Sequence, residues 1–172
     1  MSLQIHMKID GVTGEAESLK YKGWCEIFSW NWGMTSNRKS ITAKDGIKTM
    51  MNEIAVIKPI GIDSTQIRNL YALGEVIPSV QLIIAPIVGK REPQSNYVNI
   101  IMEDALIKSV VTGGGLEEEF YKEHLTIIFD RITFECNRPV KSKDDVDSND
   151  AVLENDFRWD VMGNKKWENQ VM

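Results

Sequence analysis

The side chains that could carry out chemistry in this chain are few and widely separated. The two histidines are His6 and His124, and the two cysteines are Cys25 and Cys136. No histidine has a carboxylate or thiol beside it at metal-ligand spacing, and neither cysteine has a histidine within a few residues. Two thiols this far apart also make no disulfide framework. We therefore expect no metal, no cofactor, no catalytic residue, and buried free thiols.

Glycines and glutamates follow one another over residues 113–119. The run Gly113–Gly115 lacks the Lys-Ser or Lys-Thr that completes a phosphate-binding loop, and Glu117–Glu119 would repel a phosphate. The glutamates could in principle form acid and base pairs, but such a run is more typical of a solvated face. A hairpin turn is the expected structure. The lack of a recognisable active site favours a binding or structural protein over an enzyme.

Length and composition indicate one folded domain over residues 1–172. Hydrophobic residues make up 42% and charged residues 26%, which are ordinary globular values. The net charge is −5 with dispersed basic residues, which argues against a nucleic-acid binder. No apolar run approaches the roughly 20 residues of a membrane helix, so membrane insertion is not expected. The amino terminus has no signal-peptide pattern.

The elements that must position any site are mostly strands. The stretch Gly23–Gly33 holds three of the five tryptophans, and Trp24, Phe28, Trp30 and Trp32 share one parity, as on one face of a strand. Further alternating segments are expected at 3–9, 51–58, 80–86, 97–111, 124–136 and 157–161. A bulge is expected at 103–105, and a switch of the inward parity near Asp130 and Arg131.

One helix is expected at about 63–74, capped by Asp63 or Ser64 and stopped by Gly74. A long exposed loop or hairpin is expected at about 34–50, and a mobile charged linker at about 139–156. These elements predict a mainly β domain, either a closed or nearly closed barrel or a sandwich.

The ordered motifs of the chain resemble the haemolysin-coregulated protein (Hcp) family, the tube proteins of type VI secretion systems. The motifs are Ile5–Gly11 with Gly14-Glu15, Lys22-Gly23-Trp24, Glu26–Gly33, Asp63-Ser64-Thr65 with Gly74, Ile77-Pro78, Leu106–Gly114 and Phe157–Asp160. They cover nearly the whole chain in the family's order, and the set is more specific than any one member.

The resemblance implies an antiparallel β-barrel of two sheets flanked by one short α-helix. It also implies a homohexameric ring, with rings stacking into a tube whose lumen can hold small effector proteins. The spike and sheath of the secretion system would be further partners. The protein would be cytoplasmic when made and then secreted through the type VI system without a cleaved signal peptide. A heterologous ring needs two different patches on each subunit and no catalytic site.

Two sets of residues follow as predictions. Candidate ring-interface residues are Trp32, Arg38, Ile41, Ile47, Met50 and Met51, in and beside the long loop. Candidate core anchors are Trp24, Phe28, Trp30 and Trp159, with Trp32 at the base of the loop. The alternative is a monomeric binding module, or a tube-derived effector, on the same barrel.

Overall fold

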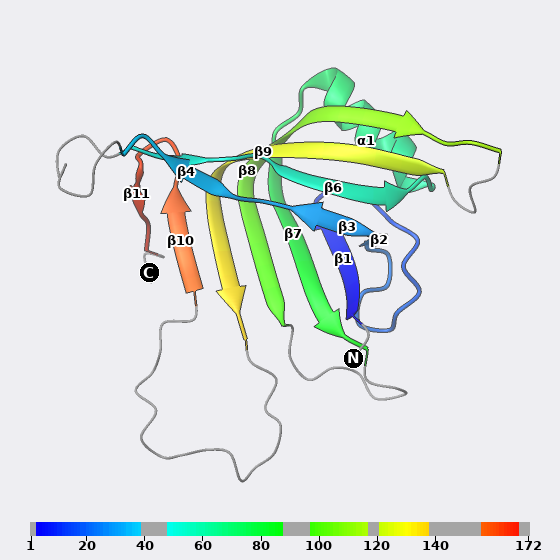
Figure 1. The fold of residues 1–172 in the computed structure, drawn as a ribbon. Coiled ribbons are helices and arrows are strands. Elements are labelled where there is room, and N and C mark those ends of the chain that lie inside the picture. The colour runs from blue at the N-terminus through cyan, green and yellow to red at the C-terminus, as the bar shows by residue number, and fades with distance from the viewer. Residues whose placement is uncertain (1–2, 39–47, 88–96, 117–120, 138–155, 169–172) are drawn as a thin grey trace, which may run out of the picture.

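The computed structural model describes residues 3–38, 48–87, 97–116, 121–137 and 156–168, and more than half of these lie in strands (Figure 1). In chain order the elements are β1 Leu3–Ile9, β2 Cys25–Glu26, β3 Ser29–Asn31, β4 Met34–Ser36, β5 Thr49–Met51, β6 Ile54–Pro59, α1 Asp63–Leu73, β7 Ile77–Pro86, β8 Val98–Gly113, β9 Lys122–Cys136, β10 Asp156–Asp160 and β11 Lys165–Lys166. The prediction of a mainly β fold with one helix is confirmed.

Nine strands form one antiparallel main sheet. Its central order is β11-β10-β9-β8-β7-β1-β2, and β6 joins it by pairing with both β9 and β3. The other two strands in the described part of the chain, β4 and β5, form a separate two-stranded sheet. The main sheet curls on itself as the expected barrel would, although its strands form one continuous sheet beside a separate hairpin. The reason is that β8 and β9, at 16 and 15 residues, run through both halves and leave no break between them.

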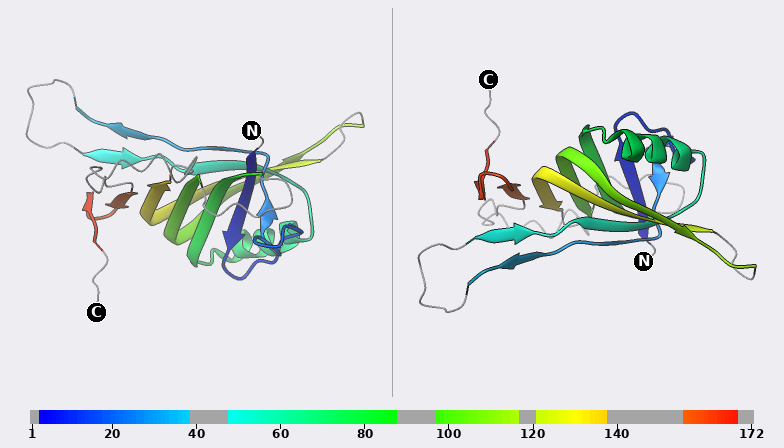
Figure 2. Two further views of the ribbon diagram at one scale, coloured as in Figure 1. Left: turned by 90° about the horizontal axis from the view of Figure 1, so that it is seen from below. Right: turned by 90° about the horizontal axis from the view of Figure 1, so that it is seen from above.

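The tryptophan stretch brings the two ends of the curled sheet together. Its first part, β2, pairs with β1, and its second part, β3, pairs with β6. Between these short ladders, the Ile27 amide donates to the Ile5 carbonyl at 3.0 Å, and the Phe28 amide donates to the Ile57 carbonyl at 2.8 Å. The strand pairs thus form a circuit that passes from β1 through β7, β8, β9 and β6. The tryptophan stretch completes it, through β3 and β2, back to β1. Figure 2 shows the curl from both ends.

The long β8–β9 pair bends between its two halves. The register shifts between Ile107 and Ser109, and Asp104 has a φ of 50°. Along β9 the buried side chains change parity between Phe129 and Ile132, as predicted near residues 130–131. This bend lets the first half of β9 pair with β6 and the second half with β10.

The helix ends as predicted but begins differently. Gly74 is left-handed, with a φ of 62°, and its amide donates to the Tyr71 carbonyl at 3.1 Å. The N-cap position is Ile62, which makes no side-chain cap, so the predicted capping role of Asp63 or Ser64 is wrong. Both side chains are buried in a polar network instead. No helix among the described residues is long and apolar enough to cross a membrane.

The tryptophan stretch does not keep one face toward the core. Cys25 and Ile27 are buried, whereas Phe28 is 45% exposed, so the prediction that Phe28 is a core anchor is wrong. After this point Trp30 and Trp32 pack against the core as half-buried side chains. The inward parity changes because β2 ends at Glu26 and β3 begins at Ser29, and the two residues between them belong to neither ladder.

Two predicted segments lie mostly outside the described residues. The long loop at 34–50 begins and ends as the β4–β5 hairpin, while 39–47 is not described. The charged linker at 139–156 is described only at Asp156, the first residue of β10.

Candidate functional site

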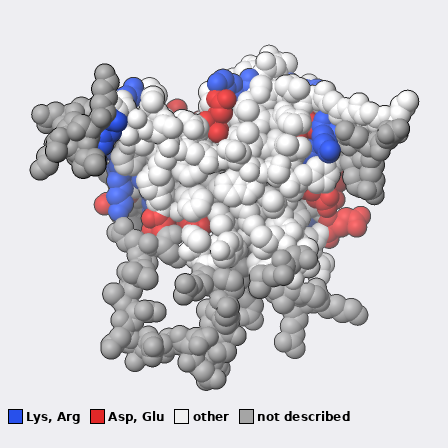
Figure 3. Space-filling model, viewed as in Figure 1, with Lys and Arg blue, Asp and Glu red and all other residues white. Residues whose placement is uncertain are grey.

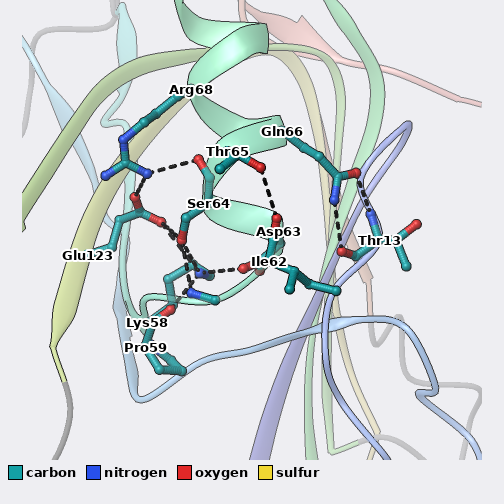
Figure 4. A network of polar contacts seen from close by, with 11 residues as sticks. Thr13, Lys58, Pro59, Ile62, Asp63, Ser64, Thr65, Gln66, Arg68 and Glu123 are labelled. Carbon is teal, nitrogen blue, oxygen red and sulfur yellow. Dashed lines mark hydrogen bonds and ion pairs between the residues drawn. The ribbon is translucent and has the colours of Figure 1, made fainter.

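Two features of the structure are candidates for a functional site. One is a buried polar network beneath α1. The other is the β4–β5 hairpin, which we call the arm. The polar network consists of Lys58, Asp63, Ser64, Arg68 and Glu123 (Figure 4). The arm consists of β4 and β5. The first feature has the residue types of an active site, and the second contains predicted interface residues.

Lys58 lies at the centre of the polar network. It follows Ile54 and Val56 on the inward parity of β6, so the strand directs its side chain into the interior, where it is 1% exposed. Its ammonium nitrogen lies 2.9 Å from the Asp63 carboxylate and 3.4 Å from the Glu123 carboxylate. It also donates to the Pro59 carbonyl at 2.6 Å and contacts the Ser64 hydroxyl oxygen at 3.3 Å. These oxygens replace the water that a buried ammonium loses.

Glu123 faces Lys58 across the β6–β9 ladder and is completely buried. Its Oε1 pairs with the Arg68 guanidinium at 2.6 Å, and its Oε2 accepts from the Ser64 hydroxyl at 2.9 Å. The same Arg68 nitrogen donates to the Ser64 carbonyl at 2.9 Å. The network therefore fastens the first turns of α1 to two strands of the main sheet.

The polar network balances its charges internally, with two cations against two carboxylates. A cavity of about 30 Å³ adjoins it and is lined by Glu15, Glu26, Lys58, Pro59 and Asp63. That volume admits a water molecule but no organic substrate. Among the described residues no group of three or more His, Cys, Asp or Glu side chains could hold a metal ion. The arrangement is suited to holding the fold.

Cys25 borders the polar network from the core side and is 1% exposed. Burial, and then the negative charge of Asp63 and a hydrogen bond to it, raise the pKa of the Cys25 thiol far above its ordinary value. A thiol held protonated in this way is a poor nucleophile. Cys136, the other free cysteine, is exposed at the end of β9, so the expectation of buried thiols is right for Cys25 and wrong for Cys136.

His6 is buried on the opposite face of the sheet, although its place in the sequence predicts a wet face. The loop before β2 folds back and stacks the Tyr21 ring on the imidazole, with centroids 4.8 Å apart. Gly14 allows this close return, because a Cβ there would lie 2.2 Å from the Trp24 carbonyl oxygen. Burial lowers the pKa of His6.

The arm leaves the main sheet immediately after Trp32. The Asn52 amide donates to the Gly33 carbonyl at 3.0 Å, which closes the root of the hairpin. Beyond the root, Met34 and Met50 are exposed, whereas Met51 packs against the core. Both views in Figure 2 show the arm projecting away from the curled sheet at one end of the molecule.

Aromatic side chains from three segments pack at the root of the arm. The Trp32 ring lies 5.9 Å from Phe134 of β9 and 6.5 Å from Phe157 of β10, measured between centroids. Phe157 in turn stacks on Trp159 at 5.9 Å. We call these four residues the aromatic base. They join the point where the arm begins to β9 and β10 of the main sheet.

The structure therefore places the predicted residues in different environments. Of the core anchors, Trp30 and Trp159 pack against the main core, and Trp24 packs instead on the outer cluster of Tyr21, Ile83 and Ala85. Of the interface candidates, Trp32, Met50 and Met51 lie in or at the arm, and Arg38 is exposed just beyond β4. Ile41 and Ile47 lie outside the described residues.

Sequence reasoning missed the polar network. Its signal was present, since Ile54, Val56 and Lys58 share one parity, as do Glu123, Leu125 and Ile127. When a charged residue lies on the inward-facing parity of each of two strands, the pattern indicates a buried ion pair.

Comparisons with solved structures show the same fold. The chain is similar to Hcp1 from Salmonella typhimurium, with a TM-score of 0.73 and 22% identity over 97% of this chain and all of that one. A structure described as a type six secretion system protein aligns with a TM-score of 0.79 and 19% identity, over 96% of this chain and 100% of that one. A type VI secretion system effector from Yersinia pestis gives 0.66 and 20%, over 91% and 99%. No curated protein sequence matches.

The sequence itself carries the family assignment. The profile of the family described as "Type VI secretion system effector, Hcp" matches residues 6–136, which run from β1 to the end of β9. This range includes the tryptophan stretch, the arm, the polar network and the long β8–β9 pair. The chain therefore belongs to the Hcp family, the tube proteins of type VI secretion systems.

Proposed function

We propose that this protein assembles as a hexameric ring and that the rings stack into the exported inner tube of a type VI secretion system. The observation that carries the proposal is a pair of unlike projections at opposite ends of the subunit. The arm extends from one end, and the β8–β9 pair, where β8 ends at Gly113 and β9 begins at Lys122, extends from the other (Figure 2). A closed ring joins two different surfaces of each subunit, head to tail.

Exposed apolar side chains at both projections support this arrangement. Met34 and Met50 are 52% and 47% exposed on the arm. At the far end, Val111, Leu116 and Tyr121 are exposed. Apolar side chains left in water at projecting ends are typical of surfaces that bind another protein. Of the candidate ring contacts, Trp32, Arg38, Met50 and Met51 lie in or beside the arm.

The distribution of charge is consistent with a protein contact. On the face of the molecule that looks onto β3 and β6, the charged groups gather toward the edges and the middle is largely uncharged (Figure 3). Interface cores are depleted of charged residues relative to their rims.

Within the secretion system the remaining partners follow from the family. We propose contacts with the spike, the sheath and small effector proteins held in the ring lumen. The protein would be made in the cytoplasm and exported by the system itself, without a cleaved signal peptide. It would act without catalysis, a role supported by the self-contained polar network.

Size in solution tests this proposal. We expect light scattering during size-exclusion chromatography to give a particle of six chains of 19.6 kDa each. The alternative, a monomeric binding module or a tube-derived effector on the same fold, predicts a single chain at every concentration. A strict monomer at high protein concentration would reject the ring, and turnover of a peptidoglycan, lipid or nucleic-acid substrate would favour the effector.

A further inference from the structure

The arm is held from outside by one side chain of the C-terminal hairpin. The amide nitrogen of Thr49, the first residue of β5, donates to the Oδ1 atom of Asn164 at 3.2 Å. Asn164 lies in the turn between β10 and β11, far away in the sequence. The contact therefore joins the arm to a hairpin at the opposite end of the chain.

The arm needs such a contact because its own structure is small. β4 and β5 have three residues each, and among the described strands they pair only with one another. A two-stranded hairpin alone is marginally stable in water. The Lys48 amide donates to the Asn37 Oδ1 at 2.8 Å within the arm, which favours the hairpin but does not direct it. The direction of the arm therefore has to come from contacts with the rest of the molecule.

Asn164 combines two properties that this position requires. Its φ is 47°, a left-handed conformation that Asn, Asp and Gly tolerate. The turn that carries it is fixed by the Gly163 amide, which donates to the Asp160 Oδ1 at 2.8 Å. Glycine would satisfy the backbone alone, but only a side chain with an acceptor can also reach the Thr49 amide.

We propose that Asn164 is a positioning residue that sets the direction in which the arm leaves the main sheet, and thereby the contact that the arm makes with a neighbouring copy of this chain. The second part of this inference rests on the proposed ring. Asn164 acts through the arm and needs no contact with the neighbour itself.

The substitution Asn164→Gly tests this inference, because it keeps the left-handed backbone and removes the side chain that carries the acceptor. Asn164→Asp keeps both the backbone and the acceptor and is the matched control. In full-length protein we expect Asn164→Gly to exchange the Thr49 amide hydrogen about fivefold faster, as for the loss of one hydrogen bond. The concentration at which rings dissociate should rise by at least the same factor. Asn164→Asp should behave like the wild type in both measurements.

A second variant approaches the bond from its donor. Thr49→Pro removes the amide hydrogen, and proline is tolerated on a strand edge where that hydrogen points outward. The double variant with Asn164→Gly should assemble no worse than Thr49→Pro alone, because both changes remove the same bond. Fully additive losses would overturn the inference.

The outcomes separate this inference from the proposed ring. If the wild type forms rings, and Asn164→Gly has the same Thr49 amide exchange rate and the same ring dissociation concentration as the wild type, the positioning role is wrong and the ring stands. If Asn164→Gly weakens the ring but leaves the Thr49 exchange unchanged, Asn164 acts elsewhere and the inference is also wrong. If the wild type never assembles, both proposals fail.

Discussion

The indole of Trp32 stacks on the ring of Phe134 with an angle of 25° between their planes, at the point where the arm leaves the main sheet. Phe134 belongs to β9, whose other half supports the polar network through Glu123. One strand therefore carries both the root of the arm and the anchor of α1. Because Phe134 and Glu123 lie in different halves of β9, a change at Trp32 is expected to affect the arm and to leave the polar network intact.

The first prediction concerns Trp32→Ala. Removing this half-buried ring takes away contacts with Phe134 and Phe157, which should lower the free energy of unfolding by about 2–3 kcal/mol. Because the arm begins at the next residues, the variant should also fail to form rings. Thermal unfolding and light scattering would measure the two effects.

Trp24→Ala is the matched control for that experiment. Trp24 is also half-buried but packs edge-on against Tyr21, with centroids 5.3 Å apart, in the outer cluster. We expect a similar loss of stability and intact rings. Rings that survive Trp32→Ala, or that are lost equally in both variants, would contradict a specific role for the root of the arm.

The sequence predicted the strands and the helix well because alternation and turn residues are local signals. It failed at Phe28 for a physical reason. Parity was extrapolated through the whole tryptophan stretch, but Ile27 and Phe28 bond to two different strands, β1 and β6. When the chain changes the strand with which it pairs, the side chains that face the core can change parity. Which strand it pairs with depends on residues far away in the sequence. The burial of His6 could not be predicted for the same reason, because Tyr21, the residue that covers it, lies in a loop.

The site was predictable only in part. The segment 34–50 stands out because its composition differs from that of the strands around it, whereas a ring contact at Met50 or Met51 stays a prediction. The bond from Thr49 to Asn164 joins segments whose proximity only the folded sheet creates. Nothing in the local sequence of either residue indicates it.

The second prediction concerns the buried ammonium of Lys58. Lys58→Met leaves the Asp63 carboxylate buried without its cation, which should cost about 3–5 kcal/mol. Urea unfolding at a fixed protein concentration would measure the loss. Lys108→Met is the control, because Lys108 pairs with Glu53 at 2.6 Å on the surface and should cost less than about 1 kcal/mol. Equal losses would mean that the polar network is not a structural anchor.

The third prediction is a dependence of stability on pH through His6. Burial lowers the pKa of the folded imidazole below its ordinary value of 6.5, so the unfolded chain binds the proton more readily. This contribution to stability is complete above about pH 7 and is lost as the pH falls below 6.5. The titratable and charged groups that face the imidazole are the Tyr21 ring, with Lys20 over it, and Glu26, which is the partner of His6 in the β1–β2 ladder.

His6→Phe isolates this effect, because His124 and the carboxylates still titrate in the variant. The difference in unfolding free energy between the wild type and His6→Phe should be constant above pH 7 and should shift against the wild type below 6.5. A difference that stays constant down to pH 5 would show that His6 is protonated as easily in the folded state as in the unfolded state.

The fourth prediction contrasts the two thiols. Burial and the Asp63 carboxylate raise the pKa of Cys25, so both access and ionisation oppose its reaction with a disulfide reagent. Cys136 is exposed. In Cys136→Ser we expect no reaction in the native protein and one thiol per chain after unfolding in urea. Cys25→Ala, the converse variant, should react in the native state. Prompt reaction of native Cys136→Ser would mean that the interior beside Lys58 and Asp63 opens readily, and the polar network would then not hold α1 closed against the main sheet.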